Sequence, residues 1–67
     1  MIQVMVNGKA HRFERPVEVA ALLSTLNLVG KKVAVERNGE IVPRSAFGRS
    51  RVADGDRIEV VIAVGGG

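Results

Sequence analysis

The chain has 67 residues, 46% of them hydrophobic, which suffices for one small domain with a thin core. It contains no cysteine and one histidine, His11, which excludes disulfides, thiolate or multi-histidine metal sites, and Ser–His or Cys–His catalytic pairs. The net charge of +3 comes from basic residues scattered among acidic ones, and the chain has no Tyr or Trp to stack on bases. We therefore expect no metal and no nucleic-acid partner.

The first half of the sequence predicts a β-hairpin followed by a helix. Apolar side chains alternate along residues 2–6, which is the period of a strand with one face in a core. Asn7-Gly8 is typical of a type I′ turn, in which both central residues need a positive φ, so residues 9–13 are expected to return as a second strand. An amphipathic helix, with Glu18 at its start and its end within 27–30, is predicted by the apolar stripe Val19, Leu22, Leu23 and Leu26.

The second half predicts short strands and one long last strand. After the helix we expect a strand over 33–36, a turn at 38–39 and a short strand over 40–43 that a proline stops. A loop or single helical turn over 45–50, held by a phenylalanine, should follow, then another turn at 54–56 and the last strand over 57–64.

The order of these segments predicts an α+β fold in a single domain. One helix is available to cover one face of a mixed sheet, and a small roll of four to five strands on that helix is the natural packing. The first six residues are too short and too polar for a signal peptide, and no segment is long enough to span a bilayer. We expect a soluble cytoplasmic protein without a membrane partner, with a domain over 1–64 and a flexible glycine tail over 65–67.

The tail Gly65-Gly66-Gly67 suggests a function of its own. Three glycines contribute no side chain to a core, and they offer a slim backbone that ends in an unhindered carboxylate. Such a segment suits insertion into a narrow active site that acts on the carboxylate itself. The alternative is a frayed end or a remnant of cloning.

The order of the elements and three segments of the sequence resemble a known protein family. The layout resembles the ubiquitin-like β-grasp, and residues 35–44 (VERNGEIVPR), 54–61 (DGDRIEVV) and 63–67 (AVGGG) closely resemble the ThiS family of sulfur carriers in thiamine (thiazole) biosynthesis. The first hairpin and the helix also fit, so the resemblance covers nearly the whole chain. Glu18 departs from the family, which often has a Thr helix cap at this place, and this affects stability more than function.

The resemblance implies a carrier that is acted upon, not an enzyme. In the family, a ThiF-like partner uses ATP to adenylate the terminal carboxylate, here that of Gly67, and persulfide sulfur then replaces AMP to give a thiocarboxylate. A ThiG-like thiazole synthase receives the sulfur. The carrier itself would bind no cofactor, and Gly65 and Gly66 would lie inside the partner active sites.

Strand parity predicts an exposed partner surface. If the even-numbered residues of 58–64 face the helix, then Val61 and Ala63 face outward, and the same parity places Met5 on that face. The first and last strands are neighbours in a β-grasp sheet. We therefore expect a small apolar patch of Met5, Val61 and Ala63 that contacts a partner, the alternative being scattered exposed apolar residues.

Three further functions fit the same residues. A MoaD-like carrier would use the same tail chemistry for another pathway, although the chain length suits ThiS better. A ubiquitin-like modifier would join Gly67 to a lysine of a target protein. A non-catalytic β-grasp interaction or RNA-binding module would leave the glycine tail without a role.

Overall fold

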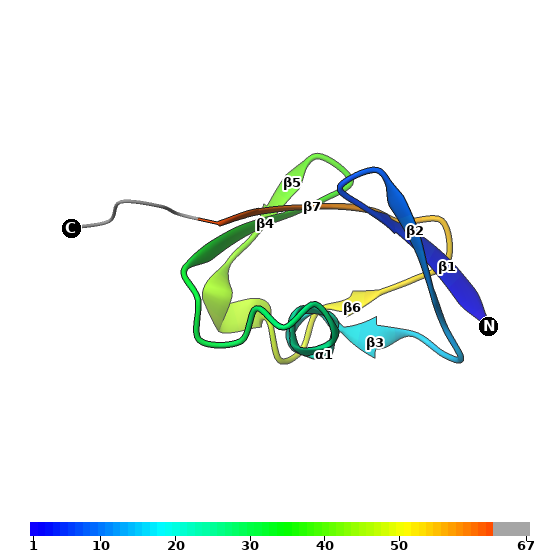
Figure 1. Ribbon diagram of the computed structural model, residues 1–67, viewed down its shortest axis with the longest axis horizontal. Helices are drawn as coiled ribbons and strands as arrows, with labels where there is room; N and C mark the ends of the chain where they lie inside the picture. The colour runs from blue at the N-terminus through cyan, green and yellow to red at the C-terminus, as the bar shows by residue number, and fades with distance from the viewer. Residues whose placement is uncertain (63–67) are drawn as a thin grey trace.

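A five-stranded mixed sheet packs over one helix in the computed structural model, which describes residues 1–62 (Figure 1). The strand order is β2-β1-β7-β4-β5, and a separate pair, β3-β6, lies beside the helix. This confirms the predicted α+β architecture. In chain order the elements are β1 (Ile2–Val6), β2 (Lys9–Phe13), β3 (Val17–Glu18), α1 (Val19–Thr25), β4 (Val33–Arg37), β5 (Glu40–Val42), the 3-10 turn η1 (Arg44–Ala46), β6 (Arg51–Val52) and β7 (Arg57–Ile62).

Both Asn-Gly pairs form the tight turns that their sequence predicts. Asn7 and Gly8 have φ values of 49° and 83°, and Asn38 and Gly39 have values of 51° and 87°, so all four residues are left-handed as a type I′ turn requires. The first turn joins β1 to β2 and the second joins β4 to β5, each in an antiparallel pair. These turns fix the register of the two hairpins.

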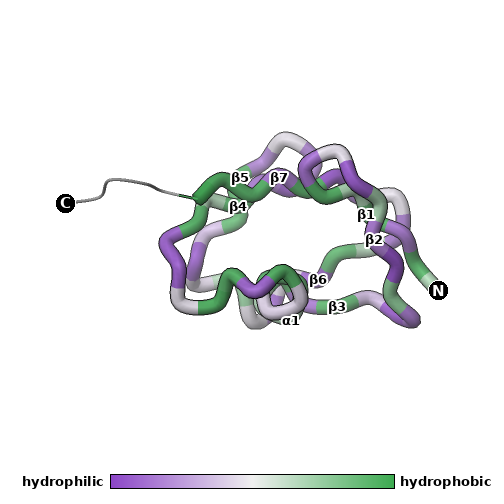
Figure 2. Tube along the Cα trace, viewed as in Figure 1, coloured by the Kyte–Doolittle hydropathy of each residue, from purple (hydrophilic) through white to green (hydrophobic). Residues whose placement is uncertain are grey.

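The core lies between the inner face of the sheet and α1. Apolar segments appear in both layers, in β4 and β7 above and in α1 below (Figure 2). The helix contributes three buried residues of the predicted stripe, and Leu26 is half-buried at its end. The sheet contributes every second residue of its central strands, as predicted from their alternation. The buried apolar residues are Ile2, Val4, Val6, Val19, Leu22, Leu23, Val35, Val42, Val52, Ile58 and Val60.

The start of α1 is held by backbone groups from elsewhere in the chain. Glu18 occupies the cap position but makes no side-chain cap hydrogen bond. Instead, the amide of Val19 donates to the carbonyl of Ser50 (2.9 Å) and the amide of Ala20 donates to that of Phe47 (2.8 Å). These carbonyls satisfy two amides of the first helical turn that have no partner within the helix, and the amide of Ala20 is one that a Ser or Thr cap could serve. The chain therefore accommodates Glu18 without a capping side chain.

The central strand β7 is held from both sides by asparagines of the two turns. Asn7 Nδ2 donates to the carbonyl of Val60 (3.0 Å), and the Val60 amide donates to Asn7 Oδ1 (2.8 Å). On the other side, the amide of Arg57 donates to Asn38 Oδ1 (2.9 Å), and the Asn38 amide donates to the carbonyl of Arg57 (2.8 Å). Each asparagine thus both forms its turn and fixes β7, the strand that leads into the predicted tail.

Asp56, in the turn before β7, is the buried polar residue of the core. Its carboxylate accepts hydrogen bonds from Arg37 Nε (2.8 Å), Asn38 Nδ2 (3.0 Å) and the Ala53 amide (2.7 Å). Burial raises the pKa of Asp56, but these three hydrogen bonds and the charge of Arg37 outweigh it, so the pKa lies below its ordinary value of 3.8. The ionised form therefore stabilises the turn.

We expect Asp56→Ala to lower the free energy of unfolding at neutral pH by about 2 kcal/mol, because three partly buried hydrogen bonds to a charged acceptor are lost. The pKa is lower in the folded state, so this stabilisation is complete above pH 3.8 and is lost as the pH falls through the folded pKa. Urea titrations across pH would measure it, with the exposed Glu14→Ala as a charge-matched control. A difference in free energy of unfolding between wild type and Asp56→Ala that does not shrink as the pH falls from 3.8 through the folded pKa would contradict this role.

Candidate functional site

The predicted tail and part of the predicted partner surface fall outside the described residues. The structure describes residues 1–62, so the expected chemistry on Gly65, Gly66 and Gly67 lies outside the described residues. The same holds for Ala63 and for the expected domain boundary at residue 64. What the structure describes is the strand that leads to them. β7 ends at Ile62, in the middle of the sheet.

Val61 and Met5 share the outer face of the sheet but are not adjacent. Val61 is 60% exposed and lies opposite Ala34 of β4, which is also exposed. Met5 is half-buried and lies opposite Arg57, four residues before Val61 along β7. Four residues of a strand span about 13 Å. The register therefore makes Ala34, and not Met5, the neighbour of Val61. Parity alone predicts which face a residue lies on, but not which residue lies beside it on the next strand.

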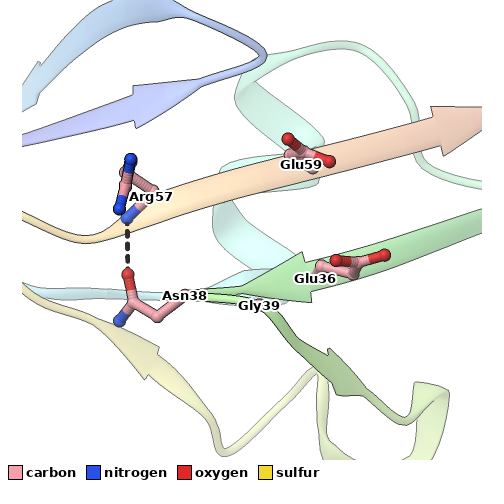
Figure 3. Close-up of a pocket in the computed structure, with 5 residues that line it drawn as sticks. All are labelled: Glu36, Asn38, Gly39, Arg57 and Glu59. Carbon is pink, nitrogen blue, oxygen red and sulfur yellow. Dashed lines mark hydrogen bonds between the residues drawn. The ribbon is translucent and has the colours of Figure 1, made fainter.

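Two glutamates also face outward beside this apolar pair. Glu36 of β4 and Glu59 of β7 are directly opposite in the register, and both line a hollow of about 280 Å³ (Figure 3). Arg57 lies at the other end of the hollow, where its amide bonds to Asn38. Strand parity predicts that both glutamates lie on the outer face, but only the register shows that they are directly opposite one another on neighbouring strands. The outer face thus presents apolar and acidic side chains next to the end of β7.

Within residues 1–62, no group of three or more His, Cys, Asp or Glu side chains is placed to hold a metal ion. The same part of the chain contains no helix that is long and apolar enough to cross a membrane. His11 lies half-buried on β2, with Val4 opposite.

The five-stranded mixed sheet over one helix defines a ubiquitin-like β-grasp protein. The model of the ThiS family matches residues 4–67, and the chain therefore belongs to the ThiS family. It is 35% identical over 65 residues to the sulfur carrier protein ThiS of Bacillus subtilis, with 96% of this chain and 98% of that one covered. The predicted family is confirmed, and this relative of nearly the same length is named a sulfur carrier protein.

A solved structure agrees with the fold. The crystal structure of a thiamine biosynthesis protein (ThiS) from Geobacter metallireducens superposes with a TM-score of 0.83, at 38% sequence identity. The match covers 98% of this chain and all of that one.

Other relatives are much longer. The chain is 44% identical over 66 residues to a thiazole synthase of Paramagnetospirillum magneticum and 38% identical to one of Magnetococcus marinus. In both cases the alignment covers 98% of this chain, and the chain spans about a fifth of the relative's length.

Proposed function

We propose that the chain carries sulfur for thiazole formation in thiamine biosynthesis, as a thiocarboxylate on the carboxyl group of Gly67. The observation that carries this proposal is the family match, which extends through the glycines to residue 67. The position of β7 supports it, because this central strand, bonded to an asparagine on either side, runs to Ile62, the last described residue before the tail in sequence.

The proposed chemistry begins with activation, because a free carboxylate would have to expel oxide and is a poor electrophile. A ThiF-like enzyme joins the Gly67 carboxylate to the AMP part of ATP and releases pyrophosphate. The terminal sulfur of a persulfide then attacks the acyl carbon and AMP leaves. A second thiol reduces the resulting acyl disulfide to the thiocarboxylate and is itself oxidised to a disulfide.

The proposed acceptor is a ThiG-like thiazole synthase. Support comes from the two longer relatives, in which a segment similar to this whole chain lies within a protein named thiazole synthase. A carrier and an enzyme in one polypeptide act on one another at high effective concentration. Because the reactions use ATP and a persulfide, we place them in the cytoplasm.

Intact-mass spectrometry tests the proposed function. The purified chain is incubated with a ThiF-like enzyme, ATP and a persulfide donor, and a parallel sample omits ATP. We expect a mass increase equal to the difference between a sulfur and an oxygen atom, only when ATP is present. An unchanged mass, or the addition of a whole target protein, would contradict the carrier function.

A charge on the outer face should separate binding from stability. Val61→Asp is expected to weaken binding to the adenylating enzyme, because an unpaired charge would be buried at the interface. The melting temperature should change little, since Val61 is 60% exposed. Val29→Asp is the matched control, because Val29 is 70% exposed in the loop after α1. Equal affinity of the two variants would exclude Val61 from the interface.

A further inference from the structure

A second surface beside the start of the tail is an apolar groove on the opposite side of the sheet. It measures about 390 Å³ and opens between the end of α1 and the strands β1, β2 and β7. The buried Val6 and Val60 line it from the sheet, and the half-buried Leu26 and Leu28 line it from the helix end. Ile62, which is 44% exposed, also lines it. Ile62 is the last described residue before the tail.

The groove keeps a defined shape because backbone bonds hold its walls. The amide of Leu28 donates to the carbonyl of Leu23 (2.9 Å), and that of Asn27 donates to Ser24 (3.0 Å). Together with the left-handed Asn27, at φ 62°, these bonds form a Schellman motif that fixes Leu28 after the helix. On the sheet side, the paired bonds between Asn7 and Val60 hold β7 against the first turn.

The charged side chain among the described residues that line the groove is Lys9. Lys9 and His11 of β2 line it from the inner face of the sheet, where their register partners are Val6 and Val4. Among the residues that the structure describes, no acidic side chain lines the groove. An ammonium group beside an apolar hollow complements a segment that carries an apolar side chain next to a carboxylate.

We propose that this groove is the docking site for the thiazole synthase, which inserts an apolar side chain flanked by an Asp or Glu. The inference rests on the proposed function and adds where the acceptor enzyme binds. The groove lies on the inner side of β7 and Val61 lies on the outer side, so the two faces of one strand would serve the two enzymes. Ile62 lines the groove and is the last described residue before the tail in sequence, which places the groove near the segment that the synthase would act on.

The test compares groove variants with matched controls in binding to the thiazole synthase, measured by titration calorimetry. Lys9→Glu is paired with Lys32→Glu, because both lysines are exposed and the change in net charge is the same. Ile62→Ser is paired with Ile41→Ser, since Ile41 is 64% exposed on β5, away from the groove. We expect each groove variant to bind about tenfold more weakly than its control.

Two further readouts separate this docking role from other causes. Affinity of the wild type should fall with added salt, and that of Lys9→Glu should fall less, because it lacks the ammonium–carboxylate attraction. Thiocarboxylate formation, measured by intact mass, should be equal in groove and control variants. Groove variants that bind the synthase as well as their controls would overturn the proposal, as would an equal loss of thiocarboxylate formation, which would assign the groove to the adenylating enzyme. A wild type that forms no thiocarboxylate would instead contradict the proposed function.

Discussion

Removing Gly67, or extending the chain beyond it with a peptide tag, is expected to abolish sulfur transfer completely. The proposed reaction takes place on the α-carboxylate of this residue. Deletion leaves a carboxylate on Gly66, one residue short of the position at which the partner enzymes would act, and a tag converts the carboxylate of Gly67 to an amide. The measurement is thiocarboxylate formation by intact mass, followed by transfer to the thiazole synthase. The melting curve should match that of the wild type, because a glycine has no side chain to contribute to a core.

The control for this prediction keeps the carboxylate and changes its surroundings. Gly66→Ala leaves the terminal group intact but adds a Cβ where the backbone must enter a narrow active site, so we expect slower transfer without complete loss. A tag of the same sequence at the N-terminus should leave transfer unchanged. Full sulfur transfer by the variant without Gly67 would rule out the carrier mechanism.

Leu22→Ala is expected to have the largest effect on stability of any single change in the core. Leu22 is 0% exposed in the middle of α1, the only α-helix that covers the sheet in the described residues. Truncating a buried Leu typically costs about 2–5 kcal/mol, and the whole stability of a small domain is about 5–15 kcal/mol. Leu23→Ala should act in the same direction, and the double variant should be largely unfolded at 37 °C.

Thermal melts followed by circular dichroism would measure these changes. Ile41→Ala is the control, because it removes similar apolar atoms from a side chain that is 64% exposed. The control should melt close to the wild type. If Leu22→Ala melts equally close, the packing of α1 on the sheet does not provide the stability that its burial indicates.

Elements with a local signal could be predicted from the sequence. The two Asn-Gly pairs indicate tight turns, because both residues readily adopt a positive φ, and the spacing of the apolar residues in α1 indicates a helix. The hairpins and the helix therefore lie where predicted. The pair β3–β6 was missed. Each strand has two residues, and Val17 pairs with Val52 from far along the chain, so no periodic pattern marks either one.

The candidate surfaces could be predicted only in part. Parity correctly placed Val61 on the outer face, but the register between strands decides which residues are neighbours, and it pairs Val61 with Ala34. The groove has no signature in the sequence either. It lies between Leu26 and Leu28 after α1 and the side chains of Lys9 and Ile62 on two different strands, and only the fold brings these segments together.

The central place of β7 has a mechanical consequence. β7 is bonded to the parallel β1 on one side and to the antiparallel β4 on the other. Backbone hydrogen bonds in a sheet lie across the strands. A force applied beyond Ile62 and directed along the strand therefore shears these hydrogen bonds, and all of them resist it at the same time. An edge strand pulled outward would lose its bonds one at a time. An enzyme that grips this chain by its end can therefore draw the whole domain toward itself without unravelling it.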